Sequence, residues 1–548
     1  MHTSKGTLGS WVVQIGLWLA ALGCAVESGQ AYGQDLDSLE LVKRGLQDPD
    51  AQIRMAALAS LQHQWQSVRT ELQAELRGGR KEQVELLLQA QRALAQQAER
   101  VADLVLADPN EQVRLRAIET LALLDCDVRQ AKIQEAWRVL LESPQQTWGV
   151  AAARAWGIRF ESLLADLVNP RVETAQSLRL AHRLANDLVT LRDLFRLALS
   201  HSEVAVRGET LRVLQDVVRG LVQRLSGWQA QLELPEFRPL GKEIFRDLVQ
   251  LVEHMRPSLQ ACLGLPHVQV RQPACQLYET LGDLAHLLEE ELMQPEGSDW
   301  AKQIRQQLAQ SIPDLLAIAV GDRDRQIRLS AWQAVEAIEA LSWRTWPALQ
   351  QGLRDDYAPV RWSAARCMQA RKPTQLTLEQ RRAMARDLAL RLIEEPEVSV
   401  RLRLAHSLKS WSSEFLAARH EIAQALESLA SPWPGVDFTP FPPAHRQSRR
   451  QVRDQDVLLA LLTALREFAE QHRRVDQEPL PTEWLQGLIL ALEAEKPAVR
   501  VEVCRIIGYY GAAAYAIRPK LLQLLNDPDP QVRGAAAQAI LRVTPPPQ

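Results

Sequence analysis

The sequence predicts an all-α chain, an α-α superhelix built from stacked antiparallel helix pairs. Leu, Ala, Gln, Arg and Glu dominate its 548 residues while Gly is sparse, and the abundant residues are good helix formers. The stretch "DPDPQVRGAAAQAIL" near the C-terminus repeats much of the earlier "DPNEQVRLRAIETLALL". A recurring unit that begins with a turn and continues as a helix is typical of a solenoid, in which each helix pair packs on the next.

Nine Val-Arg or Ile-Arg pairs, each opening an apolar stretch, set the register of the repeat. The interval is 33 residues from Arg328 to Arg361 and from Arg500 to Arg533, but 99 residues from Arg401 to Arg500. We expect the longer intervals to hold a degenerate repeat or lengthened helices. The nine arginines are Arg54, Arg114, Arg207, Arg271, Arg328, Arg361, Arg401, Arg500 and Arg533.

An acidic residue stands six positions before six of these arginines, in a turn rich in Pro and Asp. Pro cannot continue a helix and Asp bonds to nearby backbone N–H groups, so the turn separates two helices. We expect the acid to cap the second helix. We also expect each arginine to pair with the acid of its own turn or of the next repeat, giving a structural ladder. The acid and arginine of each turn are Asp48 and Arg54, Asp108 and Arg114, Asp322 and Arg328, Asp355 and Arg361, Glu395 and Arg401, and Asp527 and Arg533. The other three turns carry His201, Leu265 and Ala494 at the acid position.

Side-chain size along the second helix predicts its buried face. With the Val or Ile as position zero, position +4 is mostly small, as in Ala57, and position +8 is large and apolar, as in Leu61. These three positions share one helical face, which we expect to form the core. Positions +3 and +6 are expected to point outward, and their charges are mixed. The whole chain has 64 basic and 67 acidic residues, and without a basic stripe we expect no nucleic-acid binding.

An acidic turn, a Val-Arg pair and an alanine-rich helix together resemble the HEAT-repeat family, especially its short bacterial, armadillo-type members. The resemblance covers most of residues 40–545 and is weak around 125–200 and 410–490. It implies a right-handed solenoid whose second helices line a concave surface that binds proteins or peptides. We therefore expect a non-catalytic scaffold, monomeric by itself, that mediates protein–protein interaction. Some HEAT-like relatives are bilin lyases or base glycosylases, so an enzyme of that kind is the alternative.

Motifs for catalysis or cofactor binding are missing from the sequence. It contains no G-x-S-x-G, H-E-x-x-H, phosphate-binding loop or glycine-rich dinucleotide turn. Its six cysteines are scattered without C-x-x-C spacing, which favours small buried side chains over a metal site. We expect no enzyme activity, no cofactor and no metal.

The first 33 residues have the layout of a secretory signal peptide. A weakly charged start precedes an apolar stretch from Trp11 to Val26, and small residues follow up to Gly33. Two other interpretations remain open: a retained membrane anchor, and a lipoprotein signal in which "AALGC" resembles a bacterial lipobox with Cys24 as the lipidated residue. All three place the protein outside the cytoplasm, in the periplasm or attached to the cell envelope.

Aromatic residues indicate two places where a partner could bind. One is a tryptophan cluster in two adjacent repeats, for which packing between repeats is the other interpretation; its members are Trp332, Trp343, Trp346 and Trp362. The second is a proline-rich segment, 431–454, expected to be an irregular surface loop whose basic end opens the next helix. Its aromatic residues would either pin the loop to the solenoid or contact a partner; they are Trp433, Phe438 and Phe441. The predicted solenoid therefore spans 36–430 and resumes over 455–545.

Overall fold

The computed structural model is helical throughout the part of the chain that it describes, where no residue forms a strand. This confirms the predicted all-α fold. The described residues are 35–78, 81–124, 131–167, 187, 192–225, 238–290, 296–338, 345–369, 376–430, 444–475 and 481–544. The predicted signal segment 1–33, with Cys24, lies outside them.

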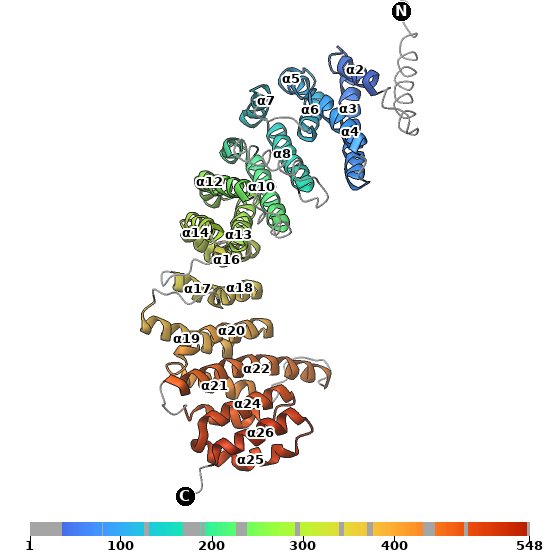
Figure 1. The fold of residues 1–548 in the computed structure, drawn as a ribbon. Helices are drawn as coiled ribbons and strands as arrows, with labels where there is room; N and C mark the ends of the chain where they lie inside the picture. The colour runs from blue at the N-terminus through green and yellow to red at the C-terminus, as the bar shows by residue number, and fades with distance from the viewer. Residues whose placement is uncertain are drawn as a thin grey trace, which may run out of the picture. The chain divides into compact units, whose positions relative to one another are not determined.

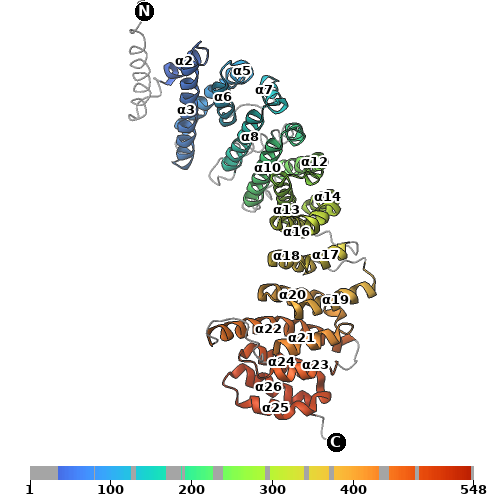
Figure 2. The ribbon, with the colours of Figure 1, turned by 180° about the vertical axis from the view of Figure 1, so that it is seen from behind.

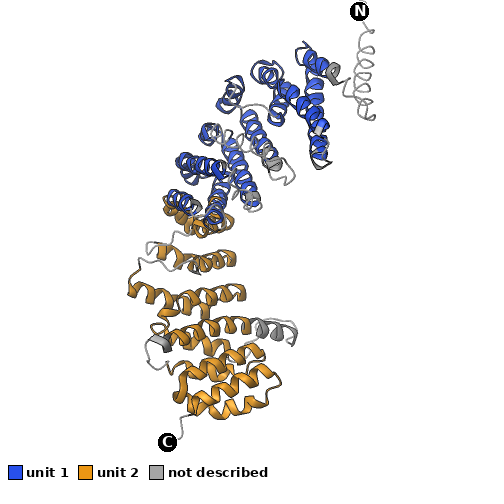
Figure 3. Ribbon diagram, in the orientation of Figure 1, with its two compact units in different colours: residues 1–280, 284–307 blue, residues 281–283, 308–548 orange. Residues whose placement is uncertain are grey.

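The chain divides into two compact units, coloured separately in Figure 3, and each unit is a stack of helix pairs. In the first unit, residues 1–280 and 284–307, second helices pack on second helices: α3 on α6, α6 on α8 and α8 on α10. The helices that lie wholly or mostly in this unit are α2 (Asp35–Gly45), α3 (Ala51–Gly78), α4 (Lys81–Ala95), α5 (Ala98–Ala107), α6 (Glu111–Leu123), α7 (Ala131–Glu142), α8 (Gln146–Leu167), α10 (Val204–Leu225), α12 (Arg238–Leu263), α13 (Val268–Glu290) and α14 (Glu296–Ala309).

The second unit, residues 281–283 and 308–548, arranges its helices in two rows (Figures 1 and 2). Second helices form one row, in which α16, α18, α20, α22, α24 and α26 each contact the next, and first helices form the other. The elements are α15 (Ile312–Gly321), α16 (Arg325–Ile338), α17 (Trp346–Gly352), α18 (Ala358–Gln369), α19 (Leu378–Glu394), α20 (Val398–Ser410), η3 (Ser412–Glu414), α21 (Arg419–Ala430), α22 (Ala444–Val475), α23 (Trp484–Ala491), α24 (Pro497–Tyr510), η4 (Gly511–Ile517), α25 (Arg518–Gln523), η5 (Leu524–Asn526) and α26 (Pro530–Val543).

The core follows the predicted pattern of sizes along the second helices. Position +4 is buried in all nine repeats, and position +8 is buried in eight of them, Ile540 being half-buried. Position +3 departs from the prediction, because it lies against the preceding second helix and not in open solvent. Glu209 at +3 of α10, for example, forms an ion pair with Arg154 of α8. Ser330 and Ser363 at the same position are buried.

Both explanations for the long intervals occur. The interval between Arg114 and Arg207 contains the extra pair α7 and α8, and the interval after Arg401 contains α21 and α22. Elsewhere the helices are longer, and α3 reaches 28 residues.

The segment predicted as a loop, 431–454, is helical at its C-terminal end. Residues 444–454 form the beginning of α22, so the basic end opens a helix as expected. No Pro or Gly follows Pro443 within the segment, so nothing there interrupts a helix. The proline-rich part, 431–443, lies outside the described residues.

Candidate interaction surface

Arginines of the acidic turns join neighbouring repeats through a two-sided set of hydrogen bonds, as Arg361 shows. Its Nη1 donates to the backbone carbonyls of Asp355 and Asp356 in its own turn, at 2.9 and 3.3 Å. Its Nε and Nη2 donate to the two carboxylate oxygens of Glu395 in the next turn, at 2.9 and 2.8 Å. The fork of one guanidinium thus satisfies a turn in each of two repeats, because its donors lie in one plane.

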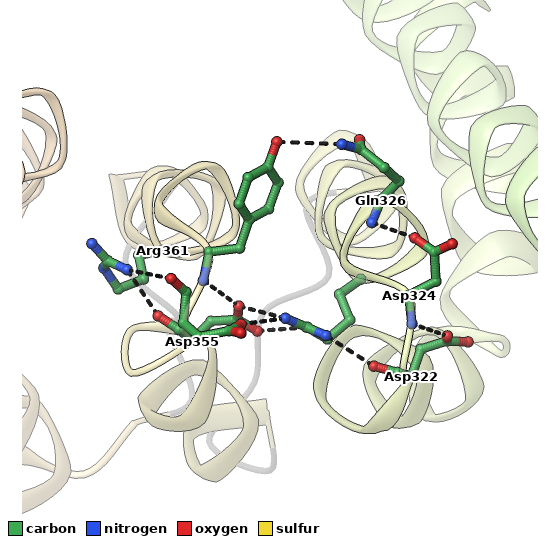
Figure 4. Close-up of polar contacts among 8 residues, drawn as sticks. Asp322, Asp324, Gln326, Asp355 and Arg361 are labelled. Atoms are coloured by element: carbon green, nitrogen blue, oxygen red, sulfur yellow. Dashed lines mark hydrogen bonds and ion pairs between the residues drawn. The ribbon is translucent and has the colours of Figure 1, made fainter.

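Three other joints have the same geometry. Arg328 donates to both carboxylate oxygens of Asp355, at 2.7 and 2.8 Å, and to the Asp322 carbonyl of its own turn at 3.1 Å (Figure 4). The remaining two are Arg54 with Asp108 and Arg500 with Asp527. In each, the arginine side chain is about a tenth exposed or less and the acid is more deeply buried. The ladder therefore runs between repeats, with the acid always supplied by the following turn.

The sequence predicted that the acid of each turn caps the second helix, and this prediction is wrong. Asp108 accepts the backbone N–H of Asn110 through Oδ1 at 2.8 Å, which closes a side-chain turn. Asn110 is the capping residue, accepting the N–H groups of Gln112 and Val113 at 2.9 and 3.3 Å. Asp108 is thus available to accept from Arg54 because Asn110, two positions later, caps the helix.

Two joints of the first unit replace the ion pair with other contacts. Arg114 lies over the ring of Trp148, with Cζ 3.9 Å from the ring centroid. His201 stands at the acid position of its turn, where Nδ1 accepts the N–H of Glu203 at 2.9 Å. Its Nε2 lies 2.8 Å from the carbonyl oxygen of Ser143 in the preceding turn, which requires Nε2 to carry the proton. A neutral imidazole thus bridges the same two turns that an Asp–Arg pair bridges elsewhere. Arg401 is buried at the equivalent place in its repeat.

A second series of ion pairs links neighbouring second helices. Lys409 of α20 pairs with Glu467 of α22 at 2.8 Å, and Arg466 of α22 pairs with Glu502 of α24 at 2.8 Å. Arg366 of α18 pairs with Glu336 of α16. These pairs are more exposed than the ladder, so each contributes little to stability. They define the solvent side of the second-helix row.

Positive charge and one tryptophan gather on this side at α18 and α20. Trp362 is half-buried, and the guanidinium carbons of Arg366 and Arg403 lie 5.5 and 4.6 Å from its ring centroid. His406 and Lys409 are exposed one and two turns further along α20. We call these five residues the basic-aromatic patch.

The electrostatics of the patch reflect its crowded cations. Burial lowers the pKa of Arg403 and the neighbouring Arg366 lowers it further, while Glu336 acts in the opposite direction. Burial likewise lowers the pKa of His406, with Arg403 and Lys409 acting in the same direction. A further anion placed here would stabilise these cations in the same sense as Glu336 does, and Trp362 offers an apolar surface beside it.

Among the described residues, the aromatic side chains predicted to contact a partner do not lie together on one surface. Trp332 is fully buried, and a Cβ on Gly352 would lie within 2.4 Å of its ring. It therefore packs between repeats, which corrects its assignment to a partner surface. Trp346 is half-buried at the start of α17, in the row of first helices. The other predicted contacts, Trp343, Trp433, Phe438 and Phe441, lie outside the described residues.

Of the five patch residues only Trp362 was predicted as a site residue; Arg366, Arg403, His406 and Lys409 were not. The available signal was an arginine at +3 of α20 next to a tryptophan at +2 of α18, which only becomes meaningful once +3 is known to face the preceding helix.

Little in the described residues suggests covalent or metal chemistry. No group of three His, Cys, Asp or Glu side chains there could hold a metal ion. Burial raises the pKa of Cys262 to about 11 and of Cys504 to about 12, so these thiols stay protonated. Among the described helices, none is long and apolar enough to cross a membrane.

A comparison with protein families identifies the repeat type in the C-terminal part of the chain. A family model described as HEAT repeats matches residues 485–547, which contain α24 and α26. No curated protein matches the sequence.

Three solved structures are similar to this chain at low identity. One comes from a study of the interaction between cadherin and β-catenin, with 12% identity, TM-score 0.42, and coverage of 92% of this chain and 94% of the other. A second is Kap121p bound to Nup53p, with 15% identity, TM-score 0.34, and coverage of 94% and 53%, so the chain spans about half the length of that protein. A third is UNC-45 from Drosophila melanogaster, with 14% identity, TM-score 0.29, and coverage of 94% and 69%.

Proposed function

We propose that this chain, which is a HEAT-repeat protein, is a non-catalytic scaffold that binds a protein partner on the second-helix face of its second unit. The observation that carries the proposal is the basic-aromatic patch. A half-buried tryptophan beside two arginines is the composition found at the energetic centre of protein interfaces. Trp332, by contrast, is wholly buried, so it serves the core.

The patch suits an acidic segment of a partner. Arg366, Arg403 and Lys409 supply three cationic groups here, of which Arg366 also pairs with Glu336 and Lys409 with Glu467. Carboxylates of the partner would pair with the guanidinium groups, and an apolar side chain would cover Trp362. The ladder beneath holds α18 and α20 in register through Arg361 and Glu395, so the patch is preorganised for binding.

We further propose that the scaffold works outside the cytoplasm. The support is the N-terminal sequence, with its apolar stretch before a small-residue region. Mass spectrometry of the N-terminal peptide from native cells distinguishes the three forms: cleavage near Ala31, retention of the stretch, or a lipid on Cys24. A cytoplasmic protein with an intact N-terminus would contradict export.

Photocrosslinking tests the binding surface. A crosslinking amino acid at position 406 should capture a defined partner, whereas the same residue at exposed position 382 on α19 should not. The captured partner is then purified and its Kd measured directly. Changing Arg366 and Arg403 together to Glu should weaken binding about a hundredfold or more, since both charge pairs become repulsive. Arg382→Glu, a charge reversal on the other row, is the matched control and should leave Kd unchanged. Equal Kd values for all variants would disprove this surface.

A further inference from the structure

Each second helix turns one side toward the following repeat, and position +5 lies at the centre of that side. This position is fully buried in eight repeats, where it holds Leu58, Ile118, Leu211, Cys275, Trp332, Ala365, Ala405 and Cys504. In α26 the same position is Ala537, which is exposed. The side of α26 that a following repeat would cover is therefore open among the described residues.

Position +9 leads to the same conclusion. In α3 it is Gln62, whose Nε2 donates to Thr120 Oγ1 of the next second helix at 3.0 Å. In α20 it is Lys409, which pairs with Glu467 of α22. In α26 it is Leu541, whose side chain is 78% exposed. Leaving so large an apolar side chain in water is unfavourable, and Leu522 and Leu525 of the same terminal repeat are also exposed.

We call the side of α26 that a following repeat would cover its trailing face. Arg533 also lies on this face. Its Nη1 donates to the carbonyls of Asp527 and Pro528 at 2.7 and 3.0 Å, as the other ladder arginines do in their own turns. No described residue accepts from its Nε or Nη2, the two donors that elsewhere hold the acid of the next turn. Beside it, a Cβ on Gly534 would meet nothing within 4 Å, whereas a Cβ on Gly208, at the same position in α10, would meet the next helix at 2.7 Å.

The side of α3 that would face a preceding repeat, which we call its leading face, is complementary to the trailing face of α26. The Asp48 carboxylate accepts the N–H of Asp50 at 2.8 Å, as the other acids do. Arg54 donates to the Asp48 backbone carbonyl, but no arginine among the described residues donates to the Asp48 carboxylate. Ile53 at position zero and Ser60 at +7 are half-buried. In the later repeats both positions are buried against the preceding helix, as when Ser407 donates to the Ala365 carbonyl at 2.7 Å.

We infer that the chain associates head to tail with a second copy of itself, the trailing face of α26 packing on the leading face of α3 in the next copy. Arg533 of one copy donates its free fork to Asp48 of the other, which extends the ladder across the junction. Leu541 is covered by the leading face, and Gly534 with Ala537 leaves room for a close approach of the two helices. A second copy fits better than any other occupant because one chain carries both halves of the joint. Each face lies within a single unit.

Such an interface is heterologous, so it joins copies head to tail into rings or open chains. The inference differs from the monomer expected from the sequence, and it is independent of the basic-aromatic patch, which lies on other helices.

Sedimentation velocity of the full chain over a concentration series tests the inference. The native chain should show a mass that rises with concentration. Asp48→Arg and Arg533→Asp should each raise the concentration needed for association about tenfold or more, because like charges then face each other. Combining both changes in one chain should restore association, since the two charges are exchanged. Arg382→Asp, an exposed reversal on α19, should behave like the native chain.

Leu541→Asp gives a measurement that does not depend on the ladder. Its side chain makes little contact within the chain, so folding should persist while association is lost. A single-chain mass at every concentration would overturn the inference, and so would association that is equally strong in the native chain, in both single charge reversals and in Leu541→Asp.

Discussion

Replacing Arg361 with Ala measures how much the ion pair between two repeats contributes to the free energy of unfolding. The change removes two hydrogen bonds to Glu395 and two to backbone carbonyls of the turn. It also leaves a carboxylate whose side chain is only 3% exposed without its cation. Removing one partner of a buried pair costs about 3–5 kcal/mol. The arginine is 11% exposed and water can partly replace it, so we expect about 3 kcal/mol.

Arg533 supplies the matched control, measured at concentrations low enough that copies of the chain do not associate. It makes the same two bonds to its own turn and has no acid beyond it among the described residues. Arg533→Ala should therefore cost at most about 1 kcal/mol. The difference between the two substitutions, about 2 kcal/mol, measures the bond between repeats. Arg361→Lys should recover only part of the loss, because an ammonium group cannot form the planar fork.

Unfolding by urea, followed by circular dichroism, measures the free energies. Hydrogen exchange then shows whether protection is lost first in α18 and α20, because stability in a repeat array is a sum of neighbour terms. Equal losses for Arg361→Ala and Arg533→Ala would refute the idea that the pair between repeats stabilises the stack.

Three further predictions concern single groups. Burial alone would raise the pKa of Asp527, but hydrogen bonds from Arg500 and a backbone N–H lower it overall. The Asp527 carboxylate therefore stabilises the fold above the unfolded pKa near 3.9, and this contribution is lost as pH falls through the folded pKa. In urea unfolding, Asp527→Asn should reduce the loss of stability that the native chain shows below about pH 4. His201→Asp should cost about 1–3 kcal/mol in the same assay, because a carboxylate would face the Ser143 carbonyl with no proton between them, while His201→Asn should cost less. Cys504 should resist iodoacetamide in the folded chain and react in denaturant, as peptide mass spectrometry can show, because burial keeps its thiol protonated; rapid labelling of the folded chain would contradict this.

The core could be predicted because it depends on one helix at a time. Residues spaced by four share a face whatever their neighbours are, so Ala57 and Leu61 were placed inside from periodicity alone. The sides of the helix could not be assigned in this way. Whether +3 meets solvent or another helix depends on the stacking of repeats, and this is why the sequence did not predict Arg403 as a site residue and left two interpretations open for Trp332.

The ladder was predictable in its residue types but not in its direction. An acid six positions before an arginine suggests a pair, yet both partners of Arg361 were within its reach, and only the stacked geometry selects Glu395. The role of His201 was hidden for another reason. An imidazole matches an acid here only because one nitrogen accepts and the other donates, and the donating side needs the Ser143 carbonyl that the preceding turn supplies.

Four ladder joints use the same arginine–carboxylate geometry, and this affects how the chain can gain or lose repeats during evolution. Arg328 and Arg361 hold different acids, Asp355 and Glu395, through the same fork, so a joint does not distinguish which repeat follows. Duplication or loss of one whole repeat would again bring a fork to an acid, whereas loss of half a repeat would bring first helices against second ones and leave both groups buried and unpaired. Evolution can therefore add or remove material here in whole repeats, and the twice-observed 33-residue spacing is the length of one such step.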